Sequence, residues 1–202
     1  MTRPFRVVAD VRDRPAWLAA RRRMLTASDA AACLGASRWR SAADVATAKA
    51  SGDELVDTEA MALGRALEEP VLRYWAQISK RRVRRARHLL ASVSRPWLGA
   101  SPDAWAYDDV DGFAAVEIKV TSSRWGSEPP PDYEIQCRVQ MAVTGVRLVH
   151  LVGLCGSTTL RRFRIAHDPV EEQRILGQLE KVWNECILPS VRRVDSNMTA
   201  GW

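Results

Sequence analysis

The chain has 202 residues, of which 47% are apolar, and 30 Lys and Arg against 24 Asp and Glu leave a net charge of +6. This length predicts one globular domain with a substantial core. No run approaches the roughly 20 apolar residues of a membrane span. Residues 1–10 lack an apolar signal sequence, so we expect a cytoplasmic protein. Four scattered cysteines without a C-x₂-C pair and three isolated histidines argue against a zinc ribbon, an iron–sulfur cluster and a Ser-His-Asp hydrolase.

The first quarter of the chain predicts helices. Three short ones are expected, over residues 13–23, over 28–35 and from 41 onward. Their predicted N-caps are Asp13, Ser28 and Ser41, because these side chains can accept a hydrogen bond from the first turn.

A longer helix follows, because apolar residues recur at helical spacing from Leu63 to Ile78. Pro70 lies within this pattern, and a proline in a helix interior removes a hydrogen bond and clashes with the preceding turn. Either the helix begins near Glu68, with Pro70 in its first turn, or it is kinked there. From the pattern alone, Glu68 is an exposed neighbour of the buried stripe.

Strands are predicted next. Residues 82–93 form a basic, strand-like stretch. The Asp-rich segment 108–112 ends in glycine between two apolar runs, 104–107 and 113–120, and therefore predicts a β-hairpin.

The second half predicts a loop over 122–132, a helix from Asp132, strands over 147–154 and 158–165, and a final helix opened by Asp168. Four or five strands flanked by helices give an α/β fold with a mixed central sheet. We expect a single domain over residues 1–189 and a loose tail over 190–202.

The hairpin carries the residues with the clearest chemistry. Asp103 starts its first strand, and Glu117 and Lys119 lie two apart on its second strand, so they share a face. Mg²⁺ or Mn²⁺ needs hard oxygen ligands and often only one or two carboxylates, which Asp103 and Glu117 supply, with the carbonyl of Ile118 as a further ligand. The ammonium of Lys119 can orient a water and neutralise charge on a phosphate.

The hairpin itself argues for such a site, because it brings Asp103 towards Glu117. The alternative is a surface hairpin whose Glu117 and Lys119 face water. The loop over 122–132 can lie over the site.

Basic clusters predict a polyanionic partner. Three arginines occupy residues 21–23, and a basic run over 80–88 precedes the hairpin. Such clusters attract nucleic acid and make binding salt-dependent. Trp39 and Trp125, each beside an arginine, can stack on bases or open a duplex end.

These residues resemble the PD-(D/E)xK nucleases, and within them the phage recombination exonucleases typified by lambda exonuclease and the YqaJ-like viral recombinases. The resemblance runs from about residue 17 to about 153. The matching segments are residues 17–29, 63–68, 98–103, 116–119 and 133–145.

The resemblance implies a restriction-endonuclease-like core and a role for each matching position. Asp103, Glu117 and Glu68 match the positions of the family's metal site, and Lys119 matches its catalytic lysine. An alignment shifted by one would place Glu69 instead of Glu68. Gln136 is implied to position the lysine or the water. Contacts to DNA or its 5′-phosphate are implied for Arg21, Ser28, Arg138 and Gln140.

The function implied is a Mg²⁺-dependent exonuclease, with Mn²⁺ as a possible substitute, that degrades one strand of linear double-stranded DNA from the 5′ end for recombination. The family further implies a homo-oligomer, a trimer by resemblance, and a single-strand annealing partner. Two alternatives are an endonuclease on the same core and a DNA-binding protein without chemistry.

Overall fold

The computed structural model describes residues 3–51, 58–156 and 158–192. Its helices are α1 (Arg14–Arg22), α2 (Ala27–Cys33), α3 (Ala42–Ser51), α4 (Glu59–Ser79), α5 (Pro131–Thr144) and α6 (Pro169–Val182). Its strands are β1 (Phe5–Asp10), β2 (Leu25–Thr26), β3 (Arg82–Arg85), β4 (His88–Ser92), β5 (Leu98–Ala100), β6 (Ala104–Asp108), β7 (Gly112–Thr121), β8 (Leu148–Cys155) and β9 (Thr159–Ala166).

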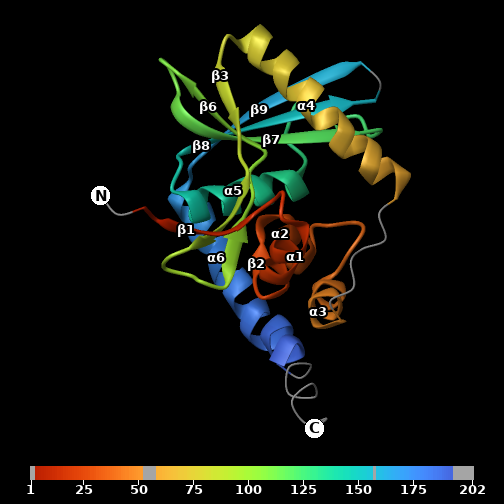
Figure 1. The fold of residues 1–202 in the computed structure, drawn as a ribbon, viewed down its shortest axis with the longest axis vertical. Coiled ribbons are helices and arrows are strands. Elements are labelled where there is room, and N and C mark those ends of the chain that lie inside the picture. The colour runs from red at the N-terminus through yellow and green to blue at the C-terminus, as the bar shows by residue number, and fades with distance from the viewer. Residues whose placement is uncertain (1–2, 52–57, 157, 193–202) are drawn as a thin grey trace.

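The predicted hairpin forms the centre of a five-stranded sheet with the order β3-β6-β7-β8-β9. β6 and β7 pair antiparallel from Ala104↔Val116 to Asp108↔Gly112. β7 and β8 are parallel, and the other pairs are antiparallel, so the sheet is mixed, as predicted. Figure 1 shows this sheet together with α4 at one end of the molecule.

Helices cover both faces of this sheet. α4 packs Val71, Leu72 and Trp75 against one face, which includes Val116 and Ile118. α5 packs on the other face, where its buried residues meet apolar side chains of β7 and β8. Because both faces are covered, the middle of β7 reads as a nearly continuous buried run.

A second sheet with the order β1-β4-β5-β2 was not predicted. The basic stretch over 82–93 was expected as one strand, but it divides at Ala86 and Arg87. β3 pairs with β6 in the large sheet, whereas β4 pairs with β1 in the small one. The split depends on partners far away in sequence, which local alternation does not specify.

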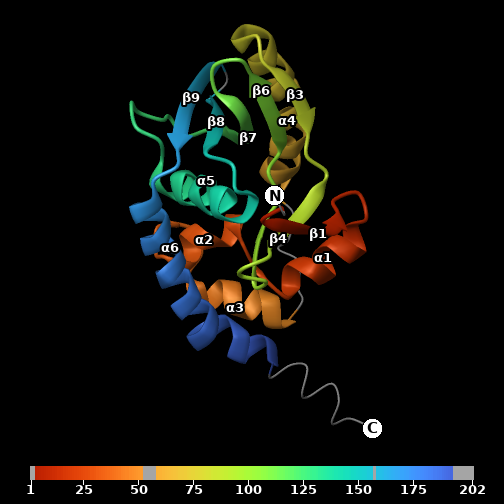
Figure 2. The same ribbon diagram turned by 90° about the vertical axis from the view of Figure 1, so that its left-hand side faces the viewer.

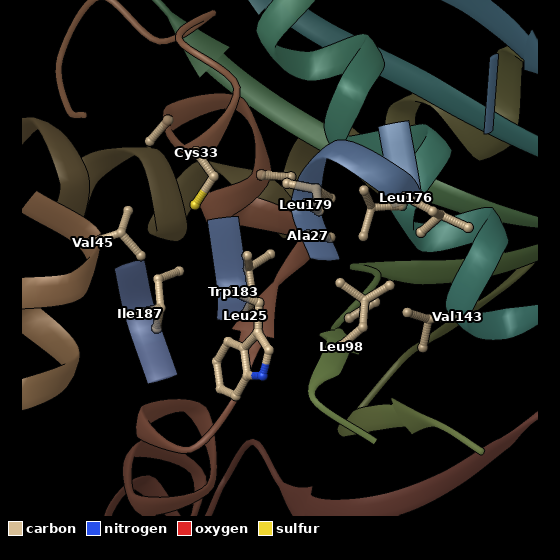
Figure 3. Close-up of a cluster of buried hydrophobic side chains, with 14 of the residues drawn as sticks. Leu25, Ala27, Cys33, Val45, Leu98, Val143, Leu176, Leu179, Trp183 and Ile187 are labelled. Carbon is tan, nitrogen blue, oxygen red and sulfur yellow. The ribbon is translucent and has the colours of Figure 1, made fainter. Parts of the chain in front are cut away.

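The largest core cluster lies below the five-stranded sheet, where α2, α5 and α6 meet the small sheet. Figure 3 shows Leu25 of β2, Leu98 of β5 and Val143 of α5 beside the buried side of α6 and its continuation, Trp183 and Ile187. Figure 2 shows α1, α2, α3 and α6 gathered in this half of the molecule. The two halves form one domain.

The C-terminal helix extends past residue 189, the predicted end of the domain. α6 runs into a π-helical turn, Trp183–Ile187, and helix continues through residues 188–192, with Val191 buried. The predicted loose tail is therefore wrong for residues 190–192, and residues 193–202 lie outside the described part.

Helix starts agree with the predictions at Asp13 and Ser41 but not at Ser28. Asp13 accepts a hydrogen bond from Ala16 N, and Ser41 and Asp44 cap α3 reciprocally. α2 begins one residue before Ser28, because Thr26 and Asp29 form its capping box.

α4 passes through Pro70 without ending, so a start near Glu68 is wrong. Pro70 and Ala66 are exposed, which lets water reach the carbonyl that the proline leaves without an N–H partner. The predicted buried stripe is shorter than expected, since Leu63 and Ile78 are exposed. Among the described residues, no helix is long and apolar enough to cross a membrane.

Candidate metal and nucleic-acid site

Asp103 is held against β7 by two hydrogen bonds. Its backbone N–H donates to the carbonyl of Val116 at 3.1 Å, and its Oδ2 accepts from the N–H of Ile118 at 2.7 Å. The hairpin therefore places this carboxylate directly beside the Glu117-Ile118-Lys119 segment.

Glu117 is only 3% exposed, so the surface-hairpin alternative is wrong. Its Oε1 accepts from Lys119 Nζ at 2.7 Å and from Gln136 Nε2 at 2.5 Å, and its Oε2 accepts from Gln140 Nε2 at 2.6 Å. Gln136 and Gln140 are one turn apart on α5 and thus face the same carboxylate. This buried carboxylate is oriented by three donors.

Glu68 reaches the site from α4. Its Oε2 lies 3.4 Å from Arg85 Nη2 on β3. Glu69 also lies 3.4 Å from Arg85, but it is more exposed and pairs with Arg73 at 2.7 Å. The charge of Glu68 helps to raise the pKa of Asp103, which favours the alignment that assigns Glu68.

The site concentrates three carboxylates in a partly buried region. Burial, followed by repulsion from Glu117 and Glu68, raises the pKa of Asp103 well above its usual range. Burial also raises the pKa of Glu68, although Arg85 opposes this. A cation beside these carboxylates would lower the cost of ionising them.

Lys119, which is partly buried, is the cation that forms an ion pair with Glu117 among the residues that the structure describes. Burial disfavours its charge, but Glu117 and Asp103 outweigh burial and raise the pKa of Lys119 above its usual value. Its Nζ also lies 5.0 Å from the centroid of the Tyr133 ring. The lysine is therefore charged and fixed between β7 and the start of α5.

The donor set fits a hard divalent cation with retained waters. Within residues 3–51, 58–156 and 158–192, no three His, Cys, Asp or Glu side chains converge closely enough to hold an ion by themselves. Asp103 and Glu117 could supply the one or two carboxylates by which Mg²⁺ is usually bound. Glu68 is close enough to act on them electrostatically.

Two predicted DNA contacts have other positions in the structure. Gln140 is fully buried and binds Glu117, so its assignment as a DNA contact is wrong. Arg138 points away from Gln136 on α5, where it donates to Glu134 at 2.6 Å and lies near Asp168 and Glu171 of α6. Its assignment as a phosphate contact at this site is also wrong, because its position on the helix turns it away from β7.

The structure does bring Arg21 and Ser28 together. Arg21 Nη2 donates to Ser28 Oγ at 3.0 Å and to Thr26 Oγ1 at 3.3 Å, while its guanidinium lies over the Trp17 ring at 4.7 Å. Ser28 is exposed. A hydroxyl and a guanidinium fixed in this way can both donate to a phosphate.

A buried charge cluster supports this pair. Asp29 is 2% exposed and lies 2.9 Å from Lys49, 3.8 Å from Arg21 and 3.7 Å from Arg40. Burial alone would raise the pKa of Asp29, but Lys49 and Arg21 outweigh it and lower that pKa to about 2. Asp29 therefore stays ionised and anchors the arginines.

The two tryptophans differ. Trp39 is 82% exposed on the segment between α2 and α3, next to Arg40 of the Asp29 cluster and to Arg38, which acts electrostatically on Tyr133. Trp125 is buried against Tyr133, 5.3 Å between ring centroids, so base stacking by Trp125 is wrong. Its burial places Trp125 against Tyr133, and the position of the 122–132 loop over the site stays a prediction.

Sequence reasoning missed several residues of the site. They are Arg85, which pairs with Glu68; Tyr133, which lies under Lys119; and Asp29, Lys49 and Arg40, which support Arg21. Arg85 lies in the predicted basic run, and Tyr133 and Asp29 lie in matching segments, but no local pattern gave these residues a role, because each meets its partner through tertiary packing. Asp29 carried a further signal, as the capping-box partner of Thr26.

Asp103, the buried Glu117 and Lys119 lie together on an α/β core, which is the arrangement that the PD-(D/E)xK pattern predicts. The chain belongs to the YqaJ-like viral recombinase domain family, whose model matches residues 16–147. No curated protein matches it.

Solved structures share the fold. An alkaline exonuclease, LHK-Exo from Laribacter hongkongensis, aligns with a TM-score of 0.71 at 20% identity, covering 92% of this chain and 98% of that chain. The same exonuclease in complex with dAMP aligns with a TM-score of 0.71 at 21% identity and the same coverage. A phage-related exonuclease from Haemophilus somnus 129PT aligns with a TM-score of 0.60 at 9% identity, covering 87% of this chain and 96% of that chain.

Proposed function

We propose that this protein is a metal-dependent exonuclease that degrades one strand of linear double-stranded DNA from the 5′ end. The observation that carries the proposal is the buried Glu117, fixed by Lys119, Gln136 and Gln140 beside Asp103. Family membership supports a role in DNA recombination, and the structures that share the fold include exonucleases.

Asp103, Glu117 and the carbonyl of Ile118 would hold Mg²⁺, or Mn²⁺ in its place, with Glu68 nearby. The ion would supply Lewis-acid polarisation of the phosphate and a bound water of lowered pKa. The donors on Glu117 keep its carboxylate in one orientation, and Lys119 places a positive charge where charge develops on the scissile phosphate.

The 5′ polarity is proposed from the Arg21–Ser28 pair. A terminal phosphate can accept from both side chains, which are already within hydrogen-bond distance of each other. Trp39 lies on the segment that joins this cluster to the side of the site near Tyr133, where it can stack on a base at the separating end.

The test is cleavage of linear duplex carrying a 5′-phosphate at one end, alongside closed circular duplex, in Mg²⁺, with Lys119→Ala as the control. We expect progressive loss of the phosphorylated strand, an intact circle and an inactive variant. A nicked or linearised circle would show an endonuclease. Binding without metal-stimulated loss of any substrate would instead show a DNA-binding protein without chemistry.

A homo-oligomer and a single-strand annealing partner are further parts of the proposal, supported by the family alone. Sedimentation of the purified protein tests the first, and co-purification with an annealing protein tests the second.

A further inference from the structure

An open groove of about 1150 Å³ lies between the two sheets, bounded by β1 and β4 on one side and by β3, β6 and β7 on the other. Five of its lining residues are arginines, four are aromatic, and none of the described residues that line it is acidic. Such a lining is suited to an anion that also presents flat apolar faces.

The floor of the groove is aromatic. Trp105 and Phe113, which come from β6 and β7, stack at 5.3 Å with an interplanar angle of 20°. Phe113 is 56% exposed and Tyr107 is 41% exposed. The rings of Phe113 and Tyr107 are therefore incompletely covered and can stack on a planar ligand.

Two arginines of the edge strand β3, Arg82 and Arg84, lie beside these aromatic residues. Val83 of β3 packs towards α4, so alternation turns Arg82 and Arg84 to the opposite face, the face of Trp105 and Tyr107. The Arg82 guanidinium lies 4.9 Å from the centroid of the Tyr107 ring. The charges and rings are therefore interleaved.

The groove reaches the candidate metal site. Arg85 lines it and also pairs with Glu68, and the N–H of Ala86 donates to the carbonyl of Asp103 at 3.0 Å. Along β7, Phe113 shares a face with Glu117, four residues or about 13 Å away. Between these two residues α5 covers Ala115, which is fully buried, so the connection from the site to the groove is at Arg85 and Ala86 and not along the face of β7.

We propose that the groove binds single-stranded DNA, as the strand left after hydrolysis. Only the origin of that strand rests on the proposed function. Cations that follow a backbone and rings that stack on bases are the means by which proteins bind single strands. Bases in a duplex are stacked on one another and cannot reach the rings. Arg85 pairs with Glu68, but a second copy of this chain would still have to neutralise the other four arginines of the lining, which includes no acidic residue among those described.

The test is binding of a fluorescent oligothymidylate with a 5′-hydroxyl, in EDTA, to the full chain. The 5′-hydroxyl removes the phosphate that Arg21 would bind, and EDTA removes hydrolysis. Two double variants probe the groove, Tyr107→Ala with Phe113→Ala and Arg82→Ala with Arg84→Ala. The control is Arg161→Ala with Arg162→Ala, two exposed arginines on β9 at the opposite edge of the same sheet.

We expect each groove variant to weaken binding about 10-fold or more. The arginine variant should also reduce the salt dependence, by about 0.7 in slope for each phosphate that is no longer bound. The β9 control should bind like the wild type. Because Arg82 and Arg84 are exposed, Arg82→Glu with Arg84→Glu provides a second variant if the aromatic one fails to fold.

Unchanged affinity in the arginine variants overturns the proposal. So does a change in sedimentation mass without a change in oligonucleotide affinity, which would assign the groove to contact between copies. A protein that binds in the groove but cuts no substrate contradicts only the proposed function. A protein that cuts DNA while its groove variants bind normally contradicts only the groove.

Discussion

At the scale of single residues, the site depends on how Glu117 is held. A carboxylate this deeply buried has a fixed orientation only because its oxygens accept from Lys119, Gln136 and Gln140. Removing a donor leaves a buried acceptor without its partner and frees the carboxylate to turn.

Gln140→Leu should therefore lower activity or metal affinity about 10- to 100-fold, the range typical when a group that orients a metal ligand is removed. Titration with Mn²⁺ and initial rates on linear duplex would measure both. Gln178→Leu, an exposed glutamine of α6, is the matched control. Wild-type metal affinity and rate in Gln140→Leu would contradict a positioning role.

Asp29 gives a prediction for stability against pH. Its folded pKa of about 2 lies below the unfolded value of about 3.9. Ionised Asp29 therefore contributes roughly 2 kcal/mol to the free energy of unfolding above pH ~4, and this contribution is lost as the pH falls towards 2. Urea unfolding of Asp29→Asn should show a correspondingly smaller decline over that window.

The same variant tests the buried pair at neutral pH. Asp29→Asn leaves Lys49 buried without its carboxylate, which should destabilise the fold by about 3 kcal/mol or more. The double variant Asp29→Asn with Lys49→Met should recover part of this stability, because it removes the uncompensated charge. If the double variant is less stable than Asp29→Asn alone, the unpaired charge of Lys49 is not the cause of the lost stability.

At the scale of elements, the helices and strands deliver these residues in different ways. The β6–β7 hairpin is local, so the closeness of Asp103 and Glu117 follows from a short turn. α4 and α5 cross opposite faces of the sheet, as Figures 1 and 2 show together, and bring Glu68 and Gln136 to the site from a distance in sequence.

Pro70 in α4 should cost stability, because an interior proline is about 3 kcal/mol less favourable than alanine in a helix. We expect Pro70→Ala to raise the free energy of unfolding by about 1 kcal/mol or more, as measured in urea. Ala62→Gly, exposed earlier in the same helix, should instead lower it by about 1 kcal/mol. A destabilised Pro70→Ala would show that the packing of α4 requires the proline.

At the scale of the whole molecule, the half with α1, α2 and α3 contributes the Arg21 cluster, and the five-stranded sheet contributes the carboxylates and Lys119. Selection of a 5′ end would require both parts to act on one DNA strand. The proposed 5′ polarity would therefore depend on the assembled domain and not on either motif alone.

Arg21→Ala should remove the preference for a 5′-phosphate over a 5′-hydroxyl end. Because the variant loses a hydrogen bond to a charged phosphate, we expect the ratio of the two rates to fall about 10- to 100-fold. Rates on matched duplexes with the two ends measure it. Arg14→Ala, which removes the other guanidinium over Trp17, is the control. Retained phosphate preference in Arg21→Ala would place the end-binding site elsewhere.

The sequence alone determined the features that depend on near neighbours: the hairpin, the shared face of Glu117 and Lys119, and the caps at Asp13 and Ser41. Turn chemistry and side-chain alternation act over a few residues, so they can be read locally. Only the tertiary structure decided that 82–93 divides between two sheets, that Gln140 holds Glu117, that Arg138 faces α6, and that Asp29 and Lys49 form a buried pair. Each of these depends on which distant segment packs against the residue, because burial and pairing are properties of the assembled core.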